Sequence, residues 1–443
     1  MKRVISGMLL VGLLVSVGSS VQPRISTGQK LLVGSAAFVL GGAGLLYYLK
    51  KRNEELKQEA STADYAGMGA SALGVVAGAG FLVKGGCEYF TQNEEVGDGP
   101  SHENVPLSGN GMGKSGGVDL FRTVMGISED AFRKKSLRER REFIEKLEAD
   151  HGLHFGDCEL RSIGDLRREN AQAGPFEGEA CLRLLIDPNV DVKELQADQA
   201  NAGAVFQVAS NFNGLESQNV FNDGNSLNRW AGVRAQGEQA SVSAFPGAVY
   251  KKYCHGPYKM LDGLVQENVL QMDPQGVRVE NVPGYDGLRQ AYRNINVLVH
   301  REVSVTHGGN FENIIARSHT IHQVFTAALN LTRDIGFERG RRDECTYLIL
   351  DAAYEGTLRA AVDLRARKVF LTLVGGGVFR NPLRLVSEVI ARSQGFIDNF
   401  NLDVTVVCRM NPARLAAQQR ALIGHLAARG FEVVDREGEG IEL

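Results

Sequence analysis

The sequence predicts an α/β protein in which a mostly parallel or mixed sheet is flanked by helices, with membrane helices at its N-terminus. Within residues 176–443, short apolar runs rich in β-branched and aromatic residues alternate with helical segments. This order favours a sheet with helices on both faces. Within residues 4–83, in contrast, long apolar runs carry no charge, and such runs are typical of helices that lie in a bilayer.

The element at the centre of the predicted sheet is the run Val369–Val374. It is continuously apolar, as expected for a strand that is buried on both faces. It leads directly into Gly375, Gly376 and Gly377, where the backbone can bend sharply and point its N–H groups at an anion such as a diphosphate. Phe379 would add an apolar wall. The alternative, which this run alone leaves open, is a glycine-rich turn without a ligand.

The other elements follow from apolar pattern and from turn signals. Ser241–Ala244 is predicted to open a helix or a turn. The predicted strands are 181–186, 205–210, 295–300, 304–306 and 404–408, the predicted helices are 322–329, 345–366, 382–393 and 412–429, and a short apolar stretch follows at 431–434.

Composition narrows the function. The chain has 443 residues and a net charge of -3, so no overall basic field predicts a nucleic-acid partner. Six cysteines stand far apart without a CxxC pair, which indicates neither a zinc site nor a disulfide framework. His319 and His322 are spaced as on one helix face, but no third ligand stands nearby, and the adjacent pair Cys254 and His255 rarely face each other. We expect no cofactor and no metal.

Residues 1–90 are predicted to be membrane-associated. A basic start precedes the apolar run Val4–Val17, and the uncharged run Leu31–Leu49 is followed at once by Lys50, Lys51 and Arg52, an arrangement favoured at a membrane interface. A third run, Ala66–Val83, is rich in small residues that suit helix packing in lipid. A cleaved signal peptide followed by one anchor, and a buried hairpin outside any membrane, are the alternatives.

Two segments are predicted to join this region to the α/β domain of residues 176–443. Residues 91–118 are polar and rich in glycine, which is typical of a flexible linker. The stretch Ser108–Ser115 within it resembles a phosphate-binding loop, but serine replaces the first glycine and no strand precedes it. Residues 119–175 are predicted to be a charged helical extension, supported by ion pairs between neighbouring turns.

A second candidate loop follows the predicted strand 205–210. Asn211 and Asn213 stand at the carboxyl end of this strand, where side-chain amides can both donate hydrogen bonds to sugar hydroxyls and accept them. Alternatively, the two asparagines form a turn and satisfy local backbone groups. An amide loop beside one strand and a glycine loop beside another suit a ribose and a diphosphate, and together they predict a cleft for ADP-ribose or a related nucleotide.

Four segments resemble the macrodomain-like ADP-ribose-processing family of bacterial effectors and related eukaryotic proteins. They are Gln207–Glu216, Val324–Leu331, Ala352–Ala361 and Val369–Asn381, in the order and spacing of that family. The resemblance implies a macrodomain-type fold, with asparagines facing the distal ribose and the glycine loop cradling the diphosphate. The implied ligand-binding residues are Ser210, Asn211, Asn213, Gln236, Gly237, Gly375, Gly376, Gly377, Val378, Phe379 and Asn381.

The sequence departs from the family at a candidate catalytic position. The family pattern D-x-T-Q-G-P-A corresponds here to residues 233–239, where Gln236 and Gly237 remain but Val233 replaces the aspartate. Glycosidic cleavage commonly needs a carboxylate to activate water or to stabilise a developing oxocarbenium ion. Asp223 and Glu238 are the candidate substitutes, although neither occupies the matching position.

The sequence thus leads to two functional hypotheses. The first is a membrane-anchored protein that binds ADP-ribose or an ADP-ribosylated protein through its soluble C-terminal domain and hydrolyses the ADP-ribosyl linkage. The second is a non-catalytic ADP-ribose reader or scaffold at a membrane. The expected localisation is a membrane held through residues 4–83, with secretion as a bacterial effector as a further hypothesis.

Overall fold

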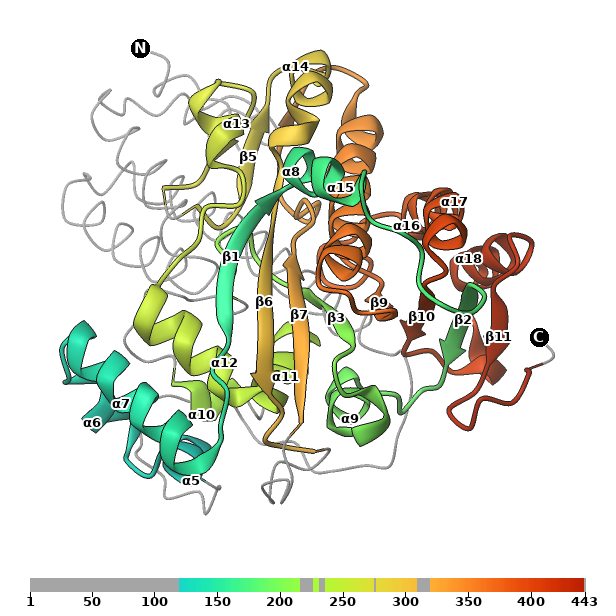
Figure 1. The fold of residues 1–443 in the computed structure, drawn as a ribbon. Helices are drawn as coiled ribbons and strands as arrows, with labels where there is room; N and C mark the ends of the chain where they lie inside the picture. Colours follow the sequence, from blue (N-terminus) through green and yellow to red (C-terminus); the bar gives the residue numbers. More distant parts are fainter. Residues whose placement is uncertain (1–118, 216–225, 231–235, 275, 309–318, 442–443) are drawn as a thin grey trace, which may run out of the picture. The chain divides into compact units, whose positions relative to one another are not determined.

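A mixed sheet forms the middle layer of the computed structural model (Figure 1). The structure describes residues 119–215, 226–230, 236–274, 276–308 and 319–441, which belong to one unit, Gly111–Leu443. Within these ranges no helix is long and apolar enough to cross a bilayer. The predicted membrane segments and the linker lie outside the described residues.

The main sheet has eight strands in the described part of the chain, in the order β1-β6-β7-β3-β9-β10-β2-β11. Strands β7 through β11 in this order run parallel, whereas β6 is antiparallel to both of its neighbours. The predicted mixed sheet is therefore confirmed. The bounds are β1 (Asp157–Ser162), β2 (Cys181–Ile186), β3 (Val205–Ala209), β6 (Asn296–Ser304), β7 (Thr320–Thr326), β9 (Lys368–Thr372), β10 (Asp403–Cys408) and β11 (Glu432–Val434).

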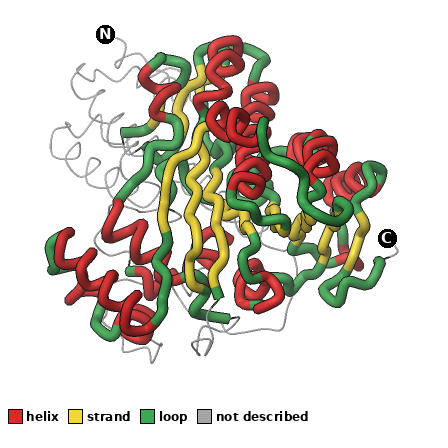
Figure 2. Tube along the Cα trace, viewed as in Figure 1, coloured by secondary structure: helices red, strands yellow, loops and turns green. Residues whose placement is uncertain are grey.

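Helices cover both faces of this sheet, and Figure 2 shows the strands as a layer between them. One face packs against α8 (Ile163–Asn170), α15 (Arg342–Asp363), α16 (Leu383–Arg392), α17 (Gln394–Phe400) and α18 (Ala417–Ala427). The other face packs against α9 (Val192–Ala197), α11 (Gln236–Ser243) and α12 (Phe245–Val249). The strand β9, buried on both faces, lies in the middle of the sheet, as its apolar run predicts.

Smaller elements sit around this core. A short second sheet lies beyond the carboxyl ends of the parallel strands, with α13 and α14 beside it (Figure 1). Its strand order is β4-β5-β8. The bounds are α13 (Asp262–Gln266), β4 (Gln271–Met272), β5 (Val279–Val282), α14 (Tyr285–Gln290) and β8 (Gly336–Phe337), with α10 at Leu227–Trp230, a π-helix at Tyr250–His255 and 3-10 helices at Gln199–Asn201, Ala291–Asn294 and Pro412–Arg414.

The N-terminal helices pack as a separate layer. Helix α5 (Leu120–Met125) and α6 (Glu129–Arg133) precede α7 (Leu137–His151), which begins at a capping box formed by Ser136 and Glu139. Phe121 of this layer packs against both Phe132 and Phe245. Residues 157–170 of the predicted helical extension instead form β1 and α8 of the sheet layer, so the part that stands apart from the sheet ends before β1.

One prediction about the middle of the chain was wrong, and the bounds of another were changed. Residues 322–329, predicted as a helix, form the end of β7 and the segment after it. A strand buried on both faces shows no alternation, so its pattern cannot be told from that of a buried helix. Residues of the predicted strands 295–300 and 304–306 meet in a single strand, β6, which ends at Ser304 and whose register shifts between His300 and Val303, where Glu302 has a φ of 50°.

Two fully buried histidines make stability depend on pH. Burial, together with the charge of Lys251, lowers the pKa of His300 to about 3, and burial lowers the pKa of His307 to about 4. The unfolded chain takes up protons below the ordinary pKa of 6.5 while these two side chains stay neutral in the folded state. The free energy of unfolding should therefore fall as the pH drops from 6.5 toward 4, by about 1.4 kcal/mol per pH unit for each histidine.

Urea denaturation across this pH window measures the effect. His300→Gln should flatten the dependence relative to the unaltered chain. An unchanged slope in His300→Gln would show that His300 titrates normally in the folded protein.

Candidate nucleotide site

The two loops singled out by the sequence lie at the same edge of the sheet. They follow β3 and β9, which are parallel neighbours with Val205 opposite Val369. The last residue of β7 and the segment after it, residues 326–331, contact both loops. The Ser210 N–H donates to the Thr326 carbonyl (2.8 Å), and the Asn381 side-chain amide donates to the Leu329 carbonyl (2.8 Å). The structure thus brings the asparagine loop and the glycine loop together, as their positions after parallel strands predict.

The chain leaves these two strands in opposite directions. After β3 the next strands of the main sheet are β6 and β7, on one side, whereas β9 is followed by β10 on the other side (Figure 1). Such a reversal opens a crevice outside the carboxyl ends of the two strands, where ligands of open α/β sheets bind. We refer to this place between the 210–215 and 375–381 loops as the β3–β9 crevice.

The glycine loop requires its first glycine. Gly375 has a φ of 75°, and a Cβ atom there would lie 2.6 Å from the Ala328 Cβ and 2.7 Å from the Asn381 Nδ2. The N–H groups of Gly377, Val378 and Phe379 donate no hydrogen bond within the described part of the chain. Since Gly377 and Val378 are exposed, these donors remain available to an anion.

The side chain of Asn381 holds this loop in place through hydrogen bonds to main-chain carbonyls. It is buried, and its Nδ2 donates to the carbonyls of Leu329, Gly375 (3.3 Å) and Phe379 (3.4 Å). The Tyr354 hydroxyl secures the start of the same loop, because it donates to the Thr372 carbonyl (2.7 Å) and accepts from the Val374 N–H (3.1 Å). This role of Tyr354 was not predicted from the sequence, because it depends on a contact between α15 and β9.

The asparagine loop is a turn held by its own side chains. Asn211 Nδ2 donates to the Leu215 carbonyl (3.2 Å), and Asn213 Oδ1 accepts from the Leu215 N–H (3.1 Å). The Ser210 hydroxyl donates to the Asn211 carbonyl (3.0 Å), and Gly214 adopts a φ of 72°. These bonds correspond to the turn that the sequence left open as an alternative, and they also fix where the amides stand.

Buried polar atoms with unused hydrogen-bonding capacity gather near the crevice. Thr326 Oγ1 and Thr372 Oγ1 at the ends of β7 and β9, and Asn213 Nδ2 and Asn381 Oδ1 in the two loops, have no hydrogen-bond partner among the described residues. Buried polar atoms in proteins are nearly always paired. Only polar groups from outside the described protein would complete the hydrogen bonding of these four atoms.

Of the two candidate carboxylates, Glu238 lies among the described residues. Glu238 lies in the first turn of α11 and is buried, with Gly237 buried beside it. Asp223 and Val233 lie outside the described residues. Gln236, the first residue of α11, uses its side-chain oxygen to accept from the Ala209 N–H (2.7 Å), so it is bound to the end of β3.

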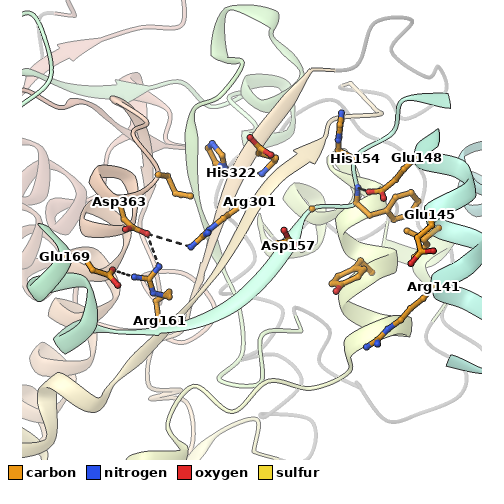
Figure 3. Close-up of a pocket in the computed structure, with 16 residues that line it drawn as sticks. Arg141, Glu145, Glu148, His154, Asp157, Arg161, Glu169, Arg301, His322 and Asp363 are labelled. Atoms are coloured by element: carbon orange, nitrogen blue, oxygen red, sulfur yellow. Dashed lines mark hydrogen bonds and ion pairs between the residues drawn. The ribbon is translucent and has the colours of Figure 1, made fainter. Parts of the chain in front are cut away.

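A groove shown in Figure 3 is lined by residues other than those of the two loops. This groove of about 910 Å³ is bordered by α7, by the end of α15 and by β1, β6 and β7, and no predicted ligand-binding residue lines it. Arg161 pairs with Asp363 (2.9 Å) and with Glu169, and Arg301 lies 3.8 Å from Asp363. Because carboxylates of the groove already neutralise these arginines, it is not an anion site comparable to the glycine loop.

The histidine and cysteine pairs noted in the sequence have ordinary surroundings. His319 pairs through Nε2 with the Gln196 carbonyl (2.7 Å), and His322 accepts from the Glu302 N–H (3.1 Å) at β7 rather than on a helix. Burial raises the pKa of the Cys254 thiol to about 11, which keeps it protonated. The described residues contain no group of three or more His, Cys, Asp or Glu side chains placed to hold a metal ion.

Neither a protein-family model nor a curated protein matches the sequence. Among solved structures, the chain is similar to poly(ADP-ribose) glycohydrolase from Thermomonospora curvata, with 15% identity and a TM-score of 0.39 over 67% of this chain and 100% of that one. It is also similar to the enzyme of the same name from Deinococcus radiodurans in complex with ADP-ribose, with 11% identity and a TM-score of 0.39 over 64% of this chain and 97% of that one.

Proposed function

We propose that the β3–β9 crevice binds ADP-ribose, free or attached to a protein. The observation that carries the proposal is the meeting of an asparagine loop and a glycine loop at a switch point of the sheet. The unpaired N–H groups of Gly377, Val378 and Phe379 suit a diphosphate. Asn211 and Asn213 suit the hydroxyls of the distal ribose. ADP-ribose itself, rather than another nucleotide, comes from the sequence resemblance of the four segments.

Calorimetric titration of the 443-residue chain with ADP-ribose tests the proposal. We expect saturable binding, with weaker binding of ADP because ADP lacks the distal ribose that the asparagines would contact. AMP, which lacks the diphosphate, should bind more weakly still. Absence of heat at about millimolar ADP-ribose would refute the site, because only binding with a free energy smaller than about 4 kcal/mol goes undetected at this concentration.

We further propose that hydrolysis, where it occurs, proceeds by attack of water on the anomeric carbon of the distal ribose. The glycine loop would hold the diphosphate, and the asparagines would orient the ribose for the attack. Breaking the glycosidic bond transfers the bonding electrons to the leaving group, which takes up a proton, and adds hydroxide from water to the ribose. Asp223 and Glu238 are the candidate groups to activate that water.

Val233 favours the second function, a non-catalytic reader that recruits ADP-ribosylated proteins. The change Val233→Asp restores the family carboxylate and is expected to create or raise release of ADP-ribose from a modified protein, by about a hundredfold for a positioned general base. Release is measured by chromatography, with Val233→Asn as the matched control. A gain in both variants, or in neither, would show that a carboxylate at position 233 is not what the chain lacks.

We also propose that the apolar runs within residues 4–83 hold the chain at a membrane. The support is the sequence alone, namely uncharged runs followed by a basic cluster at Lys50, Lys51 and Arg52. Sedimentation with membranes after alkaline carbonate extraction is the expected result. A chain that is released completely by carbonate would exclude membrane-spanning helices.

A further inference from the structure

Main-chain pairing between β3 and β9 stops early. These strands are paired at two positions, Val205 with Val369 and Phe206 with Phe370. In contrast, β3 stays paired with β7 up to Ala209, and β9 stays paired with β10 up to Thr372. The two strands that carry the candidate loops are therefore the ones that separate at their carboxyl ends.

Where the pairing with β9 has stopped, a glutamine side chain is the hydrogen-bond partner of the main chain of β3. Main-chain groups of alternate residues in a strand point to the same side. Since the Ser210 N–H reaches β7, the Ala209 N–H and the Gln207 carbonyl point toward β9. Gln236 meets both of them, because its Oε1 accepts from Ala209 (2.7 Å) and its Nε2 donates to the Gln207 carbonyl (3.4 Å).

A second glutamine side chain is the hydrogen-bond partner of a main-chain N–H group of β9. The side chain of Gln207 is fully buried, and its Oε1 accepts from the Thr372 N–H (3.1 Å). Its Nε2 donates to the Ala353 carbonyl (3.3 Å) and to the Thr357 hydroxyl (3.1 Å), both on α15. Because Thr357 also donates to the Ala353 carbonyl (2.8 Å), the amide is held in one orientation.

We propose that Gln207 and Gln236 form an amide wedge that keeps β3 and β9 apart and so sets the spacing of the two loops of the crevice. The proposal rests on the proposed function, to which it adds two positioning residues. The wedge satisfies main-chain groups that would otherwise pair strand to strand. Without it the strands can continue their ladder toward Ser210 and Gly375, which would bring the loops together and narrow the mouth.

The variant Gln207→Met tests the wedge, because it conserves length but removes all three side-chain hydrogen bonds. Gln323→Met is the matched control. Gln323 is also a fully buried glutamine, on the adjacent β7, and donates to the Ala240 carbonyl (3.0 Å). Both variants should lose thermal stability. Gln207→Met alone should weaken ADP-ribose binding, on the order of tenfold, as measured by titration of the complete chain.

Equal affinities in the two variants would overturn the proposal. If Gln207→Met fails to fold, Gln236→Met, at a partly exposed position, replaces it in the same comparison.

If the unaltered chain binds no ADP-ribose, the proposed function fails, and the wedge is judged by amide hydrogen exchange. The exchange rates of the Thr372 amide and of residues 375–381 should then change in Gln207→Met relative to the unaltered chain and stay the same in Gln323→Met. Equal exchange would overturn the wedge independently of any ligand.

Discussion

Valine in place of Gly375 is expected to abolish measurable ADP-ribose binding, a loss of at least about a hundredfold in affinity. The backbone there has a φ of 75°, which side chains other than glycine rarely adopt, and any Cβ would lie within 2.7 Å of Asn381. The loop must therefore move, and its free N–H groups lose their common direction. Calorimetric titration measures the affinity, and circular dichroism verifies that the fold remains.

The neighbouring glycines provide the controls. A Cβ at Gly377 would meet no protein atom within 4 Å, so Gly377→Ala should leave the backbone of the loop and the stability of the fold unaltered. Gly376→Ala should weaken binding to an intermediate degree, because the added Cβ would approach the flexible Leu383 side chain at 2.9 Å. If Gly375→Val folds and binds ADP-ribose normally, the glycine loop is not the diphosphate site.

Truncation of Phe206 to alanine is expected to lower the free energy of unfolding by about 3–5 kcal/mol. The Phe206 ring is fully buried and stacks on Phe370, with 4.5 Å between ring centroids and 7° between planes. It joins β3 to β9 at the last position where they pair. Removal leaves a cavity beneath the crevice and ends the stacking, and urea denaturation measures the loss.

The double variant Phe206→Ala with Phe370→Ala separates stacking from burial. We expect a coupling energy of about 0.5–1.5 kcal/mol between the two rings. Leu137→Ala, at a side chain that is 48% exposed, is the control and should cost little. A loss at Phe206 no larger than that at Leu137 would contradict the packing at the base of the crevice.

The sequence predicted the sheet best where local pattern and tertiary environment agree. The run before Gly375 is apolar throughout, ends in glycines, and forms β9 at the centre of the sheet. The helix predicted for His322–Leu329 was wrong because local pattern and tertiary environment disagree there. Alanine and leucine at its end favour a helix, and only pairing with β3 and β6 decides that β7 is a strand.

The two loops of the candidate site could be predicted from the sequence, but the residues that hold these loops in place could not. Glycines and asparagines after strands are visible in a sequence, because their backbone and amide properties are local. Gln207 and Tyr354 belong to the resembling segments, but their tasks depend on hydrogen bonds to Thr372, which lies far away in the chain. The hydrophobic periodicity of a sequence does not indicate such hydrogen bonds.

The segment after β7 gives the two halves of the crevice a common foundation. Thr326 accepts from the asparagine loop, Ala328 lies against Gly375, and Leu331 donates to the Phe379 carbonyl (3.0 Å). A displacement of this connection by a few tenths of an ångström would reach both loops at once. On the proposed function, recognition of the ribose and recognition of the diphosphate should for this reason be energetically coupled, through the protein as well as through the ligand.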